Sequence, residues 1–490
     1  MTAIRSTIRF LLNDETVELS DVRPDETVLD WLRLRRSLRG TKEGCAEGDC
    51  GACTVLVGRL GGEGLVYESV NACIRFLGSL DGCHIVTVEH LKGQNGRLHP
   101  VQQAMVDYHG SQCGFCTPGF VMSLYGLWMR EPWPSEAAIE KALQGNLCRC
   151  TGYDSIVKAA KAISDYGVAA DSELAAERAR VTEALAEMRD GSRVDIGSGK
   201  GRLVIPVSAE DLAEVLDAEP GARIVAGATD VGLWVTKFMR DIAPVVFIGH
   251  LDELKLIGEA DGVLTIGAGV TYTEAREALA ARIPAFGPLI DRIGGEQVRN
   301  MGTIGGNIAN GSPIGDMPPP LIALGATLTL RKGEARRTIP LEEFFIAYGR
   351  QDRQAGEFVE AVHVPVPKAG AHFGVHKVTK RRDEDITAAL GAFHVEVEVG
   401  RVTSARIAYG GMAATPKRAS AVEAALVGKD WSVASVEAAM DEYPKDFTPL
   451  SDMRASADYR MIVAKNLLLR FYFETTGTKK PITVNRERAA

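Results

Sequence analysis

The sequence predicts a mixed α+β protein built from several domains. Its 490 residues are enough for about three or four domains of roughly 150 residues each. Eight of its nine cysteines fall in two sets of four within the first 150 residues, which predicts two small metal-binding domains. An Ala-, Glu- and Arg-rich stretch over about 166–200 ends in glycine-rich sequence, which predicts a boundary before a longer second half.

Composition and charge argue against two classes of partner. The net charge of −8 argues against nucleic acid, and no apolar run reaches the roughly 18 residues that a membrane-spanning helix needs. Hydrophobic residues make up 46% of the chain, which is ample for several buried cores. Residues 1–12 alternate like a strand and lack the apolar stretch of a secretory segment, so we expect a cytoplasmic protein.

The first cysteine set has the spacing of a plant-type [2Fe-2S] cluster. One crowded C-x4-C-x2-C loop supplies three thiols and a later segment supplies the fourth: Cys45, Cys50, Cys53 and Cys73. Glycines in this loop allow backbone N–H groups to turn inward around an anionic cluster. A structural zinc site with four thiolates is the alternative, but zinc sites usually contain two C-x2-C knuckles.

The second set consists of two closely spaced pairs: Cys113 with Cys116, and Cys148 with Cys150. A single residue between two ligands suits a tight loop better than a tetrahedral zinc knuckle. Thr117 followed by proline is typical of an N-cap and helix start, and helix N-termini stabilise an anionic cluster. A disulfide interpretation needs an oxidising compartment.

Periodicity divides the two halves further. Strands, a helix and the first cysteine loop over 1–92 predict a small ferredoxin-like α+β domain, and four helices over 93–166 predict a four-helix bundle around the second set. We expect a linker over 167–200 that is part helical and part flexible. Strands at 372–378, 389–399 and 402–409, with helices at 419–426 and 457–473, predict a C-terminal α+β domain.

Two segments rich in small residues favour a phosphate-bearing cofactor in the second half. Residues 223–232 run from a strand-like stretch through small residues into an apolar helix-like stretch, so consecutive N–H groups can face a pyrophosphate. Tight packing is the alternative there. Residues 300–316 are dense in Gly, Asn, Ser and Asp, which suits a ligand-wrapping loop better than a strand interior.

The strings at 44–55, 71–73, 111–119 and 145–153 closely resemble the iron–sulfur portion of the xanthine dehydrogenase and aldehyde oxidase family of molybdenum hydroxylases. The second half resembles the FAD portion of the same family. The resemblance implies a β-grasp 2Fe-2S ferredoxin domain (1–92), a four-helix-bundle 2Fe-2S domain (93–166), a vanillyl-alcohol-oxidase-type FAD domain (201–368) and a C-terminal α+β domain (369–480).

The resemblance also implies which residues hold FAD. One segment would cradle its pyrophosphate: Ile224, Val225, Ala226, Gly227, Ala228, Thr229, Asp230, Val231 and Gly232. Others would lie along the cofactor or touch the flavin: Ile293, Thr303, Gly305, Gly306, Asn307, Val359 and Lys377. Asp316 would accept from the sugar-alcohol hydroxyls. The charged run 380–385 resembles the element where NAD enters, with a solvated loop as the alternative.

The resemblance finally implies a role in electron transfer. Because the chain ends at 490 without a further large domain, we expect molybdopterin on a large partner subunit, in a heterotetramer of two small and two large chains like bacterial two-chain xanthine dehydrogenases. Gln112 would contact the partner's pterin. Electrons from purine hydroxylation there would pass through two 2Fe-2S clusters to FAD and NAD, with no catalytic residue on this chain. Aldehyde, CO or N-heterocycle hydroxylase subunits are alternatives, and a structural zinc-binding protein is a remote one.

Overall fold

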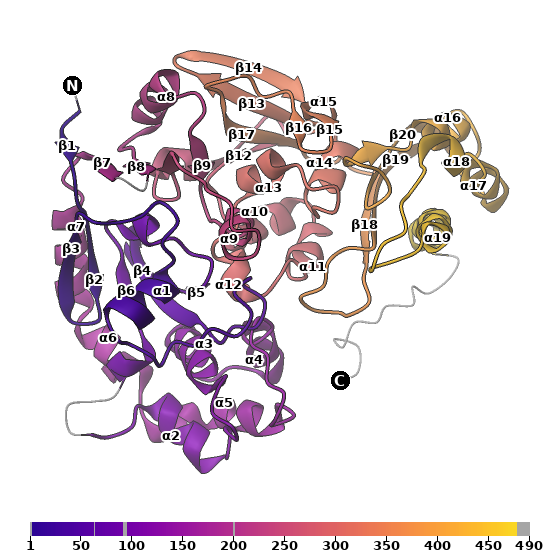
Figure 1. Ribbon diagram of the computed structural model, residues 1–490. Coiled ribbons are helices and arrows are strands. Elements are labelled where there is room, and N and C mark those ends of the chain that lie inside the picture. Colours follow the sequence, from indigo (N-terminus) through magenta and orange to yellow (C-terminus); the bar gives the residue numbers. More distant parts are fainter. Residues whose placement is uncertain (1, 63, 92–95, 199–200, 478–490) are drawn as a thin grey trace.

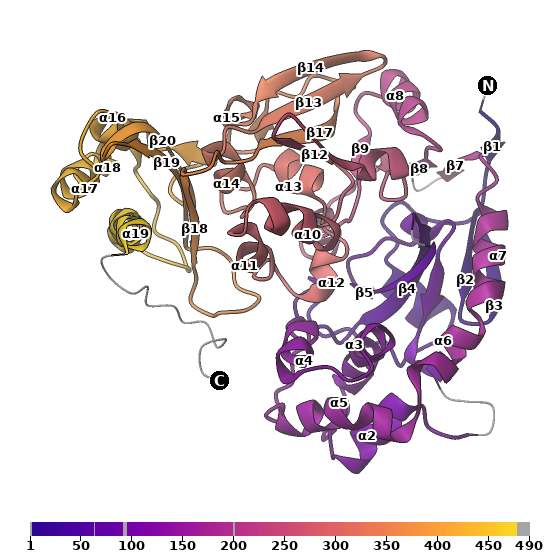
Figure 2. The same cartoon turned by 180° about the vertical axis from the view of Figure 1, so that it is seen from behind.

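The computed structural model describes residues 2–62, 64–91, 96–198 and 201–477. An N-terminal sheet with helices packed beside it is followed by a central region with two five-stranded sheets, and then by a C-terminal sheet covered by helices (Figure 1). The same order of regions is visible from behind (Figure 2). The mixed α+β, multidomain class predicted above is therefore confirmed.

The N-terminal sheet has the strand order β3-β2-β6-β4-β5. Its elements are β2 (Ile8–Leu12), β3 (Glu15–Leu19), α1 (Val28–Asp30), β4 (Thr54–Gly61), β5 (Gly64–Asn71) and β6 (His84–Val86). Strand β2 runs parallel to β6, whereas the other neighbours are antiparallel. The α1 turn continues as a π-helix whose Trp31 packs edge-on against Phe10 at 5.3 Å, so the helix covers one face of the sheet.

Four helices follow this sheet, as expected: α2 (Pro100–Asp107), α3 (Thr117–Arg130), α4 (Glu136–Ala142) and α5 (Asp154–Tyr166). Helix α3 is buried along most of its length because helices and the N-terminal sheet pack around it. The expected N-cap at its start is wrong. Cys116 occupies that position, and the Thr117 hydroxyl donates to Ser111 instead at 2.8 Å.

The segment expected as a linker, 167–200, is largely ordered secondary structure. It contains α6 (Glu173–Ala176), α7 (Arg178–Met188) and β7 (Arg193–Ser198), while residues 199–200 lie outside the described residues. Val181, Leu185 and Met188 form one apolar stripe of α7 at helical spacing, and this stripe is buried against the N-terminal sheet and bundle. The helical part expected in this segment is therefore confirmed by α6 and α7, whereas residues 193–198, in the part expected to be flexible, form strand β7.

The first central sheet has the order β1-β7-β8-β10-β9. Its elements are β1 (Ile4–Arg5), β7, β8 (Gly201–Ile205), α8 (Ala209–Ala218), β9 (Arg223–Val225), α9 (Val231–Thr236) and β10 (Val245–Phe247). The pairing of β1 with β7 is parallel and places the start of the chain in this sheet instead of the N-terminal one. The chain therefore passes between the central region and the ferredoxin-like region twice, once between β1 and β2 and once between α7 and β7.

The second central sheet is antiparallel, with the order β11-β12-β17-β13-β14. Its strands are β11 (Ile257–Ala260), β12 (Val263–Gly267), β13 (Thr327–Lys332), β14 (Ala335–Pro340) and β17 (Phe358–Pro365). Short helices pack beside it: α10 (Tyr272–Arg282), α11 (Phe286–Ile290), α12 (Glu296–Arg299), α13 (Ile304–Asn310), α14 (Pro318–Ala323) and α15 (Leu341–Phe344). A small hairpin, β15 (Phe345–Ala347) with β16 (Arg350–Gln351), follows α15.

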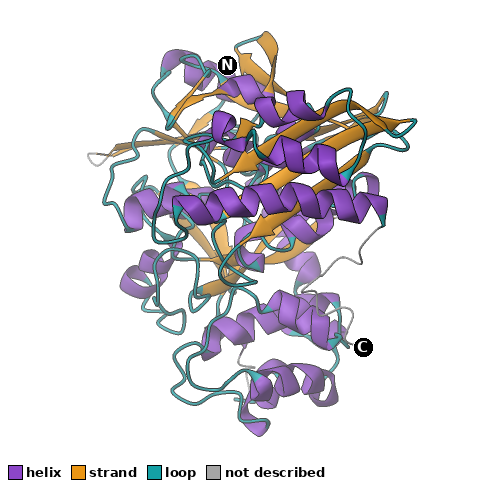
Figure 3. Cartoon of the chain, turned by 90° about the vertical axis from the view of Figure 1, so that its right-hand side faces the viewer, coloured by secondary structure: helices purple, strands orange, loops and turns teal. Residues whose placement is uncertain are grey.

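The C-terminal sheet, β18-β19-β20-β21, is formed by strands close to the predicted ranges. They are β18 (His372–Val378), β19 (Ala389–Glu398), β20 (Arg401–Gly410) and β21 (Lys417–Arg418), followed by α16 (Ser420–Leu426), α17 (Val433–Met440), α18 (Tyr443–Asp446) and α19 (Ala457–Thr476). The long helix α19 lies across the sheet (Figure 3), where Phe471 stacks on Phe393 at 5.0 Å. Residues 478–480 of the expected domain lie outside the described residues. Within the described ranges, no helix is both long and apolar enough to cross a membrane.

Candidate metal and cofactor sites

The loop between α1 and β4, together with the end of β5, gathers the first four cysteines. Cys53 and Cys73 are buried, and Cys45 and Cys50 are partly buried. Three backbone N–H groups, from Glu47, Asp49 and Cys50, point to the Cys45 sulfur at 3.5, 3.3 and 3.4 Å. Left-handed backbone at Ala46 and Gly48 turns these N–H groups inward, as the glycine content of the loop predicts.

The four sulfurs also interact with one another. Hydrogen bonds from the Cys50 and Cys73 thiols lower the pKa of Cys45, and the same bonds raise the pKa values of their donors. Cys53 shares a further bond with Cys73, which lowers the pKa of Cys53. Thiolate is the ligand form that iron requires, and inward N–H groups stabilise its charge. This donor set fits an anionic [2Fe-2S] cluster.

The second cysteine set lies at the molecular surface. Cys113 and Cys150 are exposed and hydrogen-bonded to each other, whereas Cys116 and Cys148 are half-buried and paired likewise. The backbone N–H and hydroxyl of Thr151 donate to the Cys148 sulfur at 3.4 and 3.2 Å. These four sulfurs also fit one cluster, held between the N-terminus of α3 and the loop before α5.

Apolar side chains surround this second set at the surface. Phe115 is 46% exposed, Leu147 39% and Tyr153 38%. The predicted pterin-contact residue, Gln112, is exposed directly beside Cys113. The cluster-binding surface of the chain is therefore open and bordered by hydrophobic groups.

A direct backbone contact connects the two cysteine sets. The N–H of Leu147, next to Cys148, donates to the carbonyl of Cys50 at 3.0 Å. Gly51 lies in this contact with φ +68°, and a Cβ there would stand 2.0 Å from the Gly145 carbonyl oxygen. The contact therefore requires glycine at position 51. It joins Cys50, a residue of the first set, by one hydrogen bond to Leu147, which precedes Cys148 of the second set.

Gln297 of α12 completes a junction between three regions of the chain. Its side-chain amide donates to Thr54 at 3.1 Å, Ser123 at 3.1 Å and Asn146 at 2.9 Å. Asn146 in turn donates to the Gly51 carbonyl at 3.3 Å. Figures 1 and 2 both show α12 beside β5 at the border between the central region and the helices. The side chain is 1% exposed, so this polar network is buried and holds the cysteine loops against the central region.

The two small-residue segments of the central region lie against each other, as expected. A Cβ on Gly227 would stand 1.6 Å from the Met301 carbonyl oxygen, and one on Gly305 would stand 2.4 Å from the Ala268 Cβ. Ala228 has φ +60°, which turns the chain between β9 and α9. This close backbone approach explains why both segments contain so many small residues.

The residues after this contact fit a polar cofactor. Thr303 caps α13 by accepting from the Gly306 N–H at 3.0 Å, and the next turn of that helix carries Asn307. The Asn307 Oδ1 atom is buried and has no hydrogen-bond partner among the described residues. An unpartnered buried acceptor at this position suits a donor on a bound ligand.

Asp316 and Lys377, predicted separately, are an ion pair with an N–O distance of 2.7 Å. Both side chains are at most 10% exposed, and the Lys377 ammonium also donates to the Arg292 carbonyl at 2.8 Å. The other two predicted flavin contacts are apolar: Val359 is a buried residue of β17, and Ile293 packs at the edge of the same core.

Two cavities flank the predicted FAD segments. One of about 390 Å³ includes Ala226, Gly227, Ala228 and Thr303 in its lining. Another of about 420 Å³ lies between the first cysteine loop and the 380–388 segment, with Asp49 and Glu384 on its wall. The second cavity therefore places the charged run 380–385 beside the first cysteine set.

Helix α9 fastens the first cysteine loop to the predicted FAD cradle. The Thr236 hydroxyl donates to the Ala46 carbonyl at 2.6 Å, and the Lys237 ammonium donates to the Cys45 carbonyl. Chain segments that the sequence separates by nearly 200 residues therefore form one site.

In the neighbouring cavity, burial raises the pKa of Glu384 to about 9, and the nearby Asp49 adds to this shift.

The sequence patterns did not identify Gln297, and they included Glu384 only as one member of the charged run 380–385. Gln297 lies on a single short helical turn, and Glu384 lies in a charged run that is equally typical of a solvated loop. No local signal distinguishes either residue, because their burial depends on partners from distant segments.

Comparison with known families assigns each region of the chain. A model for the 2Fe-2S iron-sulfur cluster binding domain matches residues 10–75, and one for the [2Fe-2S] binding domain matches 87–161. A model for the FAD binding domain in molybdopterin dehydrogenase matches 198–367, and one for the CO dehydrogenase flavoprotein C-terminal domain matches 375–475. The chain therefore carries two [2Fe-2S] domains and an FAD-binding domain.

Curated relatives include the xanthine dehydrogenase of Emericella nidulans, which is 31% identical over 96% of this chain and 38% of the relative. The xanthine dehydrogenase/oxidase of Gallus gallus is 30% identical over 95% and 39%, and aldehyde oxidase 1 of Bos taurus is 29% identical over 97% and 40%. The chain thus spans about two fifths of the length of these relatives.

Solved structures similar to this chain cover about half of it. The carbon monoxide dehydrogenase from Hydrogenophaga pseudoflava is 29% identical, with a TM-score of 0.53, over 55% of this chain and 96% of its own. Quinoline 2-oxidoreductase from Pseudomonas putida 86 is 27% identical, with a TM-score of 0.51, over 56% and 96%. These neighbours are enzymes with different substrates.

Proposed function

Because the chain belongs to the molybdenum hydroxylase family, as its iron–sulfur and FAD-binding portion, we propose that it transfers electrons from a partner's molybdenum cofactor to FAD and then to NAD. The proposed reaction at that partner is the hydroxylation of a purine such as xanthine. The proposed order runs from the surface cluster at Cys113 to the inner one at Cys45. The contact between Leu147 and Cys50 is the observation that carries this proposal, because it couples the two cysteine sets directly.

The residues of this chain hold and orient the carriers. Two thiol sets bind iron, and inward N–H groups such as that of Asp49 stabilise the negative charge. The Gly227 turn lets the backbone approach a pyrophosphate. Asp316 accepts hydrogen bonds from the cofactor's hydroxyls, and Lys377 holds the Asp316 carboxylate in place. FAD, when bound, accepts electrons singly and gives up a hydride, which joins one-electron carriers to NAD.

The exposed rim around the second cysteine set supports a partner at that surface. Phe115, Leu147 and Tyr153 are apolar groups that a docked subunit would cover, and Gln112 would contact the pterin. We extend the proposal to an assembly of two such chains with two large molybdenum-containing chains. The mass of the copurified complex tests this stoichiometry.

Oxidation of an aldehyde, carbon monoxide or an N-heterocycle is the second candidate, supported by an aldehyde oxidase relative and by the two structural neighbours. One observation favours the purine enzyme over the carbon monoxide and quinoline enzymes. Relatives named xanthine dehydrogenase match 95–96% of this chain in a single alignment, whereas those structural neighbours match 55–56%. Aldehyde oxidase 1 of Bos taurus matches 97% of this chain, so coverage does not separate a purine from an aldehyde. Steady-state assays of the assembled enzyme with xanthine, an aldehyde and quinoline decide between the two candidates.

A cysteine substitution tests the order of electron transfer. Cys148→Ser in the assembled enzyme should remove one of the two cluster signals in electron paramagnetic resonance and stop NAD reduction, while FAD remains bound. Cys83→Ser is the matched control, because Cys83 is a buried thiol outside both sets. Undiminished NAD reduction by xanthine in Cys148→Ser would contradict the proposed order. Purified protein with clearly fewer than four irons per chain would contradict the whole assignment.

A further inference from the structure

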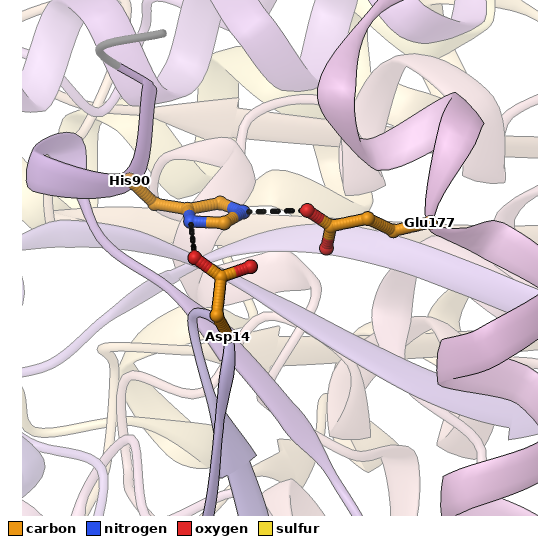
Figure 4. Close-up of side chains that lie close together, drawn as sticks. All are labelled: Asp14, His90 and Glu177. Carbon is orange, nitrogen blue, oxygen red and sulfur yellow. Dashed lines mark ion pairs between the residues drawn. The ribbon is translucent and has the colours of Figure 1, made fainter. Parts of the chain in front are cut away.

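Three side chains outside the cysteine and FAD sites converge at one edge of the N-terminal sheet. Asp14 lies in the turn between β2 and β3, His90 in the short 3-10 turn after β6, and Glu177 at the junction of α6 and α7. Figure 4 shows the imidazole of His90 between the two carboxylates, which approach it from opposite sides. One ligand atom from each residue lies within 4.8 Å of the other two, so the three side chains define one small site.

The two spacings from His90 to the carboxylates are longer than those of ordinary hydrogen bonds. His90 Nε2 lies 3.5 Å from Glu177 Oε1, and His90 Nδ1 lies 3.4 Å from Asp14 Oδ2. An N–H···O bond places its heavy atoms about 2.7–3.2 Å apart. In contrast, ligands at about 2.0–2.2 Å from a tetrahedral zinc ion lie roughly 3.3–3.6 Å from one another. The Nε2–Oε1 spacing matches two neighbouring ligands of one ion.

The histidine nitrogen that faces Glu177 makes an ion-pair contact at 3.5 Å (Figure 4) but no hydrogen bond to any described residue. The His90 side chain is 7% exposed, and within the described ranges its buried Nε2 accepts or donates no hydrogen bond. A buried ring nitrogen without a partner is unfavourable unless it binds something. Asp14 is 69% exposed, so the site borders solvent on its Asp14 side.

The two carboxylates also lie close to each other. The Asp14 and Glu177 carboxyls share a hydrogen bond. Two carboxyls forced together are stabilised by a bound cation. The guanidinium of Arg180 takes the other oxygen of Glu177, Oε2, at 3.0 Å, and it lies 3.8 Å from Asp14 Oδ1. Arg180 therefore orients Glu177 with its Oε1 atom toward His90.

We propose that Asp14, His90 and Glu177 bind a divalent transition-metal ion of the zinc class, through His90 Nε2 and one oxygen of each carboxylate. An imidazole with two carboxylates is a ligand set for zinc, with water completing the coordination. The Nδ1–H of His90 then points toward the second oxygen of Asp14, which holds the ring in place.

Such an ion would fasten the first sheet to the segment that follows the helical domain. Asp14 and His90 belong to the sheet region, whereas Glu177 starts the helix whose stripe packs on that sheet. The ion would thus add a structural link between 1–92 and 173–188. The proposal is independent of the substrate and acceptor proposed above.

The test uses the chain with its clusters and FAD in place. After removal of loosely bound metal with a mild chelator, Zn²⁺ is titrated by calorimetry, and the thermal midpoint is measured with and without Zn²⁺. The unsubstituted chain should bind one equivalent and unfold at a higher temperature with Zn²⁺. His90→Gln and Glu177→Gln should each weaken this binding at least about tenfold and remove the midpoint shift.

Glu187→Gln is the matched control, because it removes an exposed carboxylate from the same helix without touching the site. Its Zn²⁺ affinity should equal that of the unsubstituted chain. Cluster and flavin absorption must be unchanged in every variant, which excludes zinc uptake by the cysteine sets. Wild-type affinity in both His90→Gln and Glu177→Gln, or no stoichiometric binding in the unsubstituted chain, would overturn the proposal.

Discussion

Substitution of Gly51 by alanine should disrupt the contact between the two cysteine sets. The new Cβ would stand 2.0 Å from the Gly145 carbonyl oxygen and 3.0 Å from the Asn146 Cα, and both are backbone atoms that a rotamer change cannot move. The left-handed φ of +68° adds about 1–2 kcal/mol for any residue with a Cβ. Overpacking adds about 1–3 kcal/mol. The total destabilisation is about 2–5 kcal/mol.

Gly191→Ala separates these two contributions. Gly191 has φ +73°, and a Cβ there meets no atom within 4 Å, so this variant carries the backbone contribution alone. The difference between the two variants is then the free-energy cost of overpacking, about 1–3 kcal/mol. For a cooperative region of roughly 150–250 residues, this cost corresponds to a difference of about 2–12 °C in the thermal unfolding midpoint. Thermal unfolding is followed by the loss of visible cluster absorption. Equal midpoints for Gly51→Ala and Gly191→Ala would refute the idea that this backbone contact is tight.

Three further predictions concern the buried polar groups. Lys377→Met should leave the Asp316 carboxylate buried without its partner, destabilise the central region by about 3–5 kcal/mol and lower the FAD content of purified protein; unchanged flavin content would contradict it. Gln297→Leu removes an amide whose two N–H groups serve three acceptors, a loss of about two hydrogen bonds at roughly 0.5–1.5 kcal/mol each, and should lower the thermal midpoint, with an unchanged midpoint as the contrary result. Because the pKa of Glu384 is raised to about 9, the folded chain keeps a proton that the unfolded chain releases near pH 4.5. Stability should therefore fall by up to about 1.4 kcal/mol per pH unit between these values, and chemical unfolding of Glu384→Gln should show a flatter dependence.

Local patterns predicted much of the fold. The alternation at 372–378 predicted β18 with the observed bounds, and the helix signals after residue 97 predicted all four helices of the second domain. Such signals succeed because alternation and helix starts depend on neighbouring residues. The α17 and α18 helices were not predicted, because they are short and their buried faces contain few large apolar residues.

The cysteine spacings predicted both metal sites for a similar reason. A loop such as 44–53 must place three thiols around one cluster through its own backbone, so ligand spacing and glycine positions are properties of the local sequence. The residues predicted to hold FAD are a harder case. The turn at Gly227 is recognisable, but its contact with Met301 joins segments more than 70 residues apart.

The chain order of its domains, its eight candidate iron ligands and its predicted phosphate-binding turn are properties that neighbouring residues specify. Long-range packing alone places β1 in the central sheet, buries α7 where a linker was expected, and brings Gln297 between the two cysteine loops. The physical reason is that burial and hydrogen bonding at these positions depend on side chains from distant segments. The His90 site has the same origin, since its three residues meet only when the sheet and α7 are packed together.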